Sequence, residues 1–100
     1  METLDHPLRV LFVYLARSRA SRVDMELDIT ELWELVTTLG NAEVIDLIHQ
    51  KGEEFDATYI GPGKAEEVAE YLKTNPVDVI IFNGQLKQSQ KFNLLKLFWA

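Results

Sequence analysis

The residues with the clearest chemical potential form a glycine-rich turn and a lysine, Gly61-Pro62-Gly63-Lys64, directly before an expected helix. A glycine turn that leads into a helix can present free backbone N–H groups to an anion, and Lys64 would add a positive charge. The turn therefore predicts a candidate nucleotide- or anion-binding site at Gly61, Gly63 and Lys64. The alternative is structural, because glycines also supply backbone angles that a Cβ forbids.

The turn departs from both common phosphate-binding motifs. A P-loop needs a serine or threonine after its lysine to reach magnesium, and Ala65 stands there. Glu66 occupies the third glycine position of a G-x-G-x-x-G motif. Glu66 and Glu67 are also expected in the first helical turn, where they would complement the helix dipole and reduce its attraction for an added anion. These departures favour the structural interpretation.

Arg17, Arg19 and Arg22 form the one basic cluster, within a polar segment (residues 16–28) that is expected to be an exposed loop. Such a loop could lie along the phosphates of an RNA. The whole chain has 10 Lys and Arg against 16 Asp and Glu, a formal charge of −6, which repels a nucleic acid. RNA contact at these arginines would therefore be local, and simple solvation of the loop is the alternative.

The sequence predicts no catalytic residues and no metal site. The absence of cysteine excludes disulfides and thiolate metal sites, and the two histidines, His6 and His49, do not make a metal site on their own. His49 has no serine, cysteine or second histidine at a meaningful spacing, and the glutamates near residue 66 are typical of a solvated helix face. Trp33 and Trp99 lie beside apolar stripes, which favours packing over ligand stacking.

Three apolar segments are expected to form the strands that position these residues. Residues 8–15 are almost all apolar, as in a central strand covered on both faces. Residues 43–50 are interrupted by Asp46 and predict an outer strand, and residues 77–82 predict a third buried strand. Residues 57–60 are a candidate short fourth strand before the glycine turn.

Three helices are expected between and after these strands. Leu32, Leu35, Val36 and Leu39 form the stripe of a helix that begins at Asp28 or Thr30 and ends at Gly40. A second helix covers residues 64–74 and stops before Pro76. A third covers residues 89–99 and carries an apolar face, which comprises Phe92, Leu95 and Trp99 and is broadened by Leu94, Leu97 and Phe98.

The alternation of strands and helices predicts a small three-layer α/β domain, with a mostly parallel sheet of three to four strands flanked by helices. One hundred residues, 47% of them hydrophobic, fit one domain over residues 1–100. No apolar segment approaches the roughly 20 residues that span a bilayer, so we expect a cytoplasmic protein without a membrane partner. The apolar last helix predicts a partner or self-association, with Ala100 as a fragment boundary.

Several of these segments together resemble the N-terminal domain of HflX-type ribosome-associated GTPases. The resemblance rests on the run from Thr58 to Lys64, the Glu66-Glu67 helix and the strand from Asp78 to Phe82. After this strand the family has an acidic Asp-Asp-Glu-Leu turn, then Ser-Pro and a Gln-x-x-Asn-Leu helix start. The present chain has Asn83-Gly84-Gln85-Leu86, then Lys87-Gln88, and keeps Gln90, Asn93 and Leu94.

The resemblance implies a non-catalytic domain, followed in the family by a helical linker and a G domain that lie outside these residues. It implies association with the large ribosomal subunit, in ribosome splitting or recycling, and GTP and Mg as cofactors of the G domain and not of this segment. The domain would help to dock and regulate the GTPase. The alternative function is a free-standing α/β domain that binds a nucleotide or phosphorylated ligand at the turn from Gly61 to Lys64.

Overall fold

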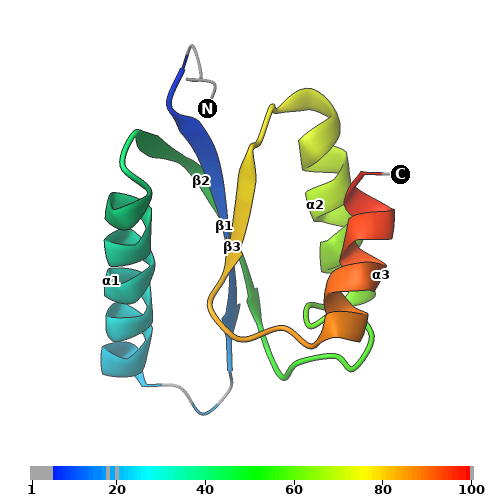
Figure 1. Ribbon diagram of the computed structural model, residues 1–100. Helices are drawn as coiled ribbons and strands as arrows, with labels where there is room; N and C mark the ends of the chain where they lie inside the picture. The colour runs from blue at the N-terminus through cyan, green and yellow to red at the C-terminus, as the bar shows by residue number, and fades with distance from the viewer. Residues whose placement is uncertain (1–5, 18, 20, 100) are drawn as a thin grey trace.

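A three-stranded parallel sheet lies between one helix on one face and two helices on the other in the computed structural model, which describes residues 6–17, 19 and 21–99 (Figure 1). The strand order is β2-β1-β3, with β1 in the centre. This arrangement confirms the expected three-layer α/β fold. The elements in chain order are β1 (Leu8–Ala16), α1 (Arg22–Leu39), β2 (Ala42–Lys51), α2 (Pro62–Thr74), β3 (Val79–Phe82) and α3 (Gln88–Phe98).

The central strand β1 is buried on both faces, as its unbroken apolar sequence predicts. Alternate residues point to opposite faces of a strand. Leu11 and Val13 therefore belong to the core shared with α2 and α3, whereas Val10 and Phe12 belong to the core shared with α1. All four are at most 1% exposed. The outer position of β2 is also confirmed, since among the described residues this strand pairs with β1 alone.

Helix α1 begins at Arg22, within the segment that was expected to be a loop. Ser21 is the N-cap: its Oγ accepts a hydrogen bond from the Asp24 N–H (3.1 Å), and the Asp24 carboxylate accepts one from the Ser21 N–H (3.0 Å). This reciprocal capping box starts the helix about two turns before the expected caps. The prediction of Asp28 or Thr30 as N-cap was wrong, since Thr30 instead donates to the Glu26 carbonyl within the helix.

The buried stripe of α1 is shifted from the predicted one. Leu32 and Val36 are buried as expected, but Leu35 and Leu39 remain 49% and 41% exposed. Met25 and Ile29, from the turns missed in the prediction, pack against the same core as Leu32 and Val36. The end of the helix at Gly40 is confirmed: Gly40 has a φ of +83°, which favours glycine.

A buried tyrosine ties α1 to the central strand. The Tyr14 hydroxyl donates to the Asp28 carboxylate at 3.2 Å. Burial of Tyr14, and then the negative charge of Asp28, raise the pKa of Tyr14 to about 12. The hydroxyl therefore remains a donor at neutral pH, so Asp28 serves the helix–sheet contact and not a helix cap.

The segment before α2 is a turn and not a short strand. Phe55 and Tyr59 exchange two backbone hydrogen bonds (2.9 and 2.8 Å) as an isolated antiparallel bridge, so the strand expected at residues 57–60 was wrong. Helix α2 then begins at Pro62, two residues earlier than expected, because proline suits the first helical position. Its end at Thr74, before Pro76, is as predicted.

Helix α3 packs against the core with the edge of the predicted apolar face and not with its centre. Gln90, Leu94 and Phe98 form the buried row. Leu94 and Phe98 belong to the predicted apolar face, but Phe92, Leu95 and Trp99 at the centre of that face are 61%, 55% and 54% exposed. No helix in the described part of the chain is long and apolar enough to cross a bilayer.

Candidate functional site

The glycine turn lies at the edge of the sheet where all three parallel strands end. It closes the loop between β2 and α2, and the loops after β1 and β3 lie at the same edge (Figure 1). Ligands of open α/β sheets bind outside the carboxyl ends of the strands. The position of the turn is therefore suitable for a site, and the contacts of each residue decide what it can do.

Gly61 is required by close packing. Its N–H donates to the Gln50 side-chain oxygen at 2.8 Å, and its carbonyl accepts from the Ala65 N–H at 2.8 Å. A Cβ at this position would lie 2.9 Å from the Gln50 nitrogen and 3.2 Å from the Phe55 ring. The backbone of Gly61 is therefore occupied within the domain and offers no free N–H to an anion.

Gly63 and Lys64 are in a more open environment. A Cβ at Gly63 would meet no atom within 4 Å. The Lys64 ammonium forms an ion pair with Glu67 at 2.9 Å, so its charge is already partly balanced. Because α2 starts early, its first turn contains no acidic residue, and Glu66 and Glu67 lie beyond it, contrary to expectation. The structure thus brings the three predicted residues together at the start of α2, where Gly63 is exposed and Lys64 is half-buried.

The turn does not fit a magnesium–nucleotide complex of the P-loop type. Pro62 has no N–H, the N–H of Gly61 is used by Gln50, and Ala65 has no hydroxyl for a metal. Within the described residues, no three His, Cys, Asp or Glu side chains are grouped to hold a metal ion.

The arginine cluster is divided between two roles. Arg17 forms an ion pair with Glu54 at 3.2 Å. The pKa of Arg17 is raised above its ordinary value, mainly by a hydrogen bond with Tyr59 and less by the charge of Glu54. Arg22 lies in α1 and not in a loop; its side chain is 92% exposed, with Glu26 at 3.9 Å. Arg19 is also exposed. Arg17 therefore fastens the loop after β2 although its side chain is 50% exposed, and Arg19 and Arg22 are exposed as well.

Asn83 is a structural residue that the sequence interpretation missed. Its side-chain amide accepts from the Leu15 N–H and donates to the Leu15 carbonyl, both at 2.9 Å. The amide thus adds a pair of hydrogen bonds, like those between neighbouring strands, between β1 and the residue after β3. The Tyr59 hydroxyl donates to the same Asn83 oxygen at 3.4 Å. The sequence signal here is the Asn83-Gly84 pair, which is typical of a turn but does not indicate this pairing.

Gln90 and Asn93 fasten α3 to the loop before the glycine turn. Gln90 is fully buried, and its nitrogen donates to the Phe55 carbonyl at 3.1 Å and to the Glu54 carboxylate at 3.4 Å. Its oxygen accepts from the Lys87 N–H at 2.8 Å. Asn93 donates to the Ala57 carbonyl at 2.9 Å. The Gln-x-x-Asn pair therefore holds the edge of the sheet together.

Comparison with known proteins gives consistent similarities. A family model described as GTP-binding GTPase N-terminal matches residues 26–99. The GTPase HflX of Thermococcus kodakarensis is 39% identical over 80 residues, which are 80% of this chain and 16% of that protein. The GTPase HflX of Alkalihalophilus pseudofirmus is 35% identical over 85 residues, 82% of this chain and 20% of that protein.

A third similar protein, the GTPase HflX of Caldanaerobacter subterraneus, is 40% identical over 67 residues, 66% of this chain and 15% of that protein. The chain therefore spans a fifth or less of the length of these curated relatives. The family match includes Gly61, Gly63 and Lys64, whereas Arg17, Arg19 and Arg22 precede it.

Proposed function

Because the chain belongs to the GTP-binding GTPase N-terminal family of HflX-type proteins, we propose that it is a non-catalytic domain that docks such a GTPase on the large ribosomal subunit. One observation carries the non-catalytic part of this proposal. The Gly61 N–H and the Gln90 side chain are engaged inside the domain, through the bond from Gly61 to Gln50 and the bonds from Gln90 to the neighbouring loop. The signature thus supports a scaffold rather than a reaction.

GTP hydrolysis would belong to a separate G domain of the whole protein. Phosphoryl transfer needs backbone amides around the phosphates and a bound Mg²⁺ to neutralise the developing charge. The turn from Gly61 to Lys64 supplies neither a ring of backbone amides for the phosphates nor a ligand for Mg²⁺. In the whole protein, GTP and Mg²⁺ would therefore be held by the G domain that the family resemblance implies, beyond a helical linker, and the present domain would position that G domain.

The surface that we assign to the ribosome is the side of the molecule with Arg19 and Arg22. Ribosomal RNA is a polyanion, and the chain as a whole has a charge of −6, so attraction depends on local positive charge. Arg22 is 92% exposed and its nearest carboxylate lies 3.9 Å away, which leaves its guanidinium largely free for a phosphate. The proposed setting is the cytoplasm, where ribosomes act.

The non-catalytic assignment predicts that the purified chain with GTP and Mg²⁺ shows no turnover above a mock preparation. Titration calorimetry with GTP, ATP and inorganic phosphate should likewise show no binding in the micromolar range. Turnover that copurifies with the chain and disappears in Lys64→Ala would contradict the proposal.

A second candidate function is the binding of a phosphorylated ligand at the start of α2, favoured by the open space around Gly63. Gly63→Ala fills this space without a clash, and Lys64→Ala removes the charge. Lys73→Ala is the matched control, since Lys73 makes a similar ion pair with Glu70 on the same helix (2.7 Å). A micromolar ligand weakened at least about tenfold by the first two variants and not by the control would establish this candidate.

A further inference from the structure

Asn83 is the only one of the four asparagines in the chain that precedes a glycine. The side-chain amide of an asparagine can react with the backbone nitrogen of the next residue, and a glycine hinders this attack least because it has no Cβ. The pair lies in the loop after β3, where Asn83 is half-buried and Gly84 is exposed. The sequence and the accessibility of the pair therefore allow deamidation at Asn83.

Deamidation at this pair consumes water and releases ammonia. The Gly84 nitrogen forms a bond to Cγ of Asn83, and the bond from Cγ to Nδ2 breaks. The Gly84 nitrogen gives up its proton, and Nδ2 leaves as ammonia. The product is a cyclic succinimide in the main chain. Water then breaks one of the C–N bonds of this ring, which leaves aspartate or isoaspartate at position 83, and the reaction requires no oxidant, cofactor or enzyme.

The central strand holds the side chain that would react. The Asn83 oxygen accepts from the Leu15 N–H, and its nitrogen donates to the Leu15 carbonyl, both at 2.9 Å. Ring closure expels this nitrogen, so the reaction cannot proceed without loss of the bond to the Leu15 carbonyl. Leu15 is 1% exposed, and leaving its carbonyl without a donor is costly at such a position. The folded state therefore opposes the reaction although the pair is accessible.

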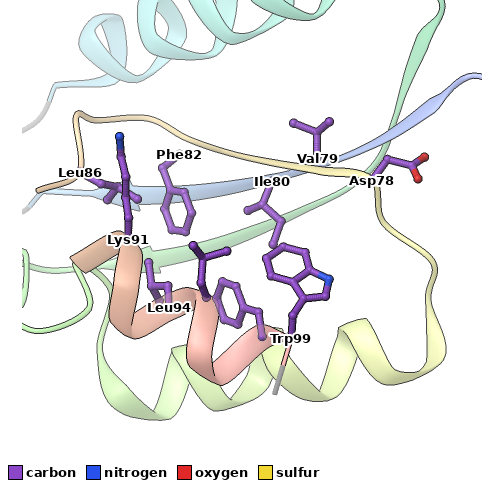
Figure 2. Close-up of a pocket in the computed structure, with 10 residues that line it drawn as sticks. Asp78, Val79, Ile80, Phe82, Leu86, Lys91, Leu94 and Trp99 are labelled. Carbon is purple, nitrogen blue, oxygen red and sulfur yellow. The ribbon is translucent and has the colours of Figure 1, made fainter. Parts of the chain in front are cut away.

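Tyr59 and the core restrain the main chain of the pair. The Tyr59 side chain packs so closely against Gly84 that a Cβ there would collide with its hydroxyl, and this hydroxyl donates to the Asn83 oxygen at 3.4 Å. Phe82 before the pair and Leu86 after it pack against the core shared with α2 and α3 and line an apolar groove beside α3 (Figure 2). Because both ends of the loop are anchored, the backbone is not free to close the ring.

We propose that Asn83 is a deamidation site gated by local opening of this edge of the sheet. In the closed state the two bonds to Leu15 keep Asn83 intact. In the open state the pair reacts at the rate of a flexible chain, so the observed rate is that rate multiplied by the open fraction. The change is permanent, because an aspartate has no donor for the Leu15 carbonyl and an isoaspartate lengthens the main chain by a methylene group. Deamidation thus converts a transient opening into a lasting loss of this contact.

Peptide mapping by mass spectrometry after incubation of the purified chain measures the reaction directly. Trypsin releases residues 74–87 as one peptide, which contains Asn83 and also Asn75. Asn75 is an internal control, because Pro76 has no N–H to attack its side chain. We expect Asn83 to deamidate at least about tenfold more slowly in the folded chain than in the chain unfolded in guanidinium chloride at the same pH and temperature. Equal rates in the two states would overturn the proposal.

A pair of tyrosine variants tests whether the gate is local. Tyr59→Phe removes the hydroxyl that donates to Asn83 and should accelerate deamidation in the folded chain at least about threefold. Tyr14→Phe is the matched control, because it removes a similar hydroxyl bond, 3.2 Å long, to Asp28 on the opposite face of the sheet. Circular dichroism must show that both variants are folded. Equal rates in the two variants would show that opening of this edge is not the gate and would contradict the proposal.

Discussion

Replacement of Gln90 by leucine is expected to lower the free energy of unfolding by about 3 kcal/mol. Leucine has a similar volume, so the core remains filled. The cost arises because the Phe55 carbonyl and the Lys87 N–H lose their partner at a fully buried position. Urea denaturation followed by circular dichroism measures the effect. The same substitution at the exposed Gln88 should change stability by less than about 0.5 kcal/mol.

The conservative variant Gln90→Glu separates hydrogen bonding from shape. An introduced carboxylate can still accept from the Lys87 N–H, but it faces the Phe55 carbonyl and the Glu54 carboxylate. Its pKa should therefore be raised in the folded state, so the variant is most stable below the ordinary glutamate pKa and loses stability as the pH rises through the raised pKa. If Gln90→Leu is as stable as Gln88→Leu, the buried hydrogen bonds of Gln90 do not hold this edge of the sheet together.

Gly84→Ala is expected to destabilise the domain by about 2 to 3 kcal/mol through overpacking. The added Cβ would collide with the Tyr59 hydroxyl and lie 3.0 Å from the ring carbon that bears it. The ring cannot move away easily, because Tyr59 is 1% exposed and packs edge-on against Phe82 with ring centroids 6.0 Å apart. The effect is measured by thermal and urea unfolding.

Two further variants test this explanation. Gly63→Ala should be neutral or slightly stabilising, because its methyl group meets nothing within 4 Å and alanine favours the helix. Tyr59→Phe removes the colliding oxygen, so the combination of Tyr59→Phe with Gly84→Ala should cost less than the sum of the single changes. Strict additivity would contradict the contact between Gly84 and Tyr59 as the cause.

The sequence was most informative where a pattern is local. The apolar run from Leu8 to Leu15 predicted the central strand because burial on both faces removes polar alternation. Gly40 and Pro76 marked the ends of α1 and α2, since one supplies a positive φ and the other cannot continue a helix. These features depend on residues close to one another in the chain, so sequence alone could identify them.

Features that depend on distant residues could not be predicted in this way. α3 buries the row of residues that contains Gln90, because the Gln90 side-chain amide donates to the Phe55 carbonyl, 35 positions earlier in the chain. No helical periodicity contains that information. Gly61 likewise depends on Gln50, whose side chain reaches it from β2. The start of α1 had a local signal, Ser21 and Asp24, but the arginines around it suggested a loop.

The candidate site was therefore only partly predictable. The sequence correctly placed Gly61, Gly63 and Lys64 at one helix start, because they are adjacent in the chain. It could not show that Glu54 pairs with Arg17, since this pair joins different loops, and the local pair of Lys64 with Glu67 was not predicted. Both partners reduce the charge available to a ligand at these two residues.

The most direct test of the docking role is cosedimentation of the purified chain with isolated large and small ribosomal subunits at the same ionic strength. We predict that the chain pellets with the large subunit and not with the small one. Combined Arg19→Glu and Arg22→Glu should weaken this binding at least about tenfold, whereas combined Lys51→Glu and Lys73→Glu, with the same charge change, should not. Absence of binding to the large subunit, or equal binding to both subunits, would contradict the proposed function.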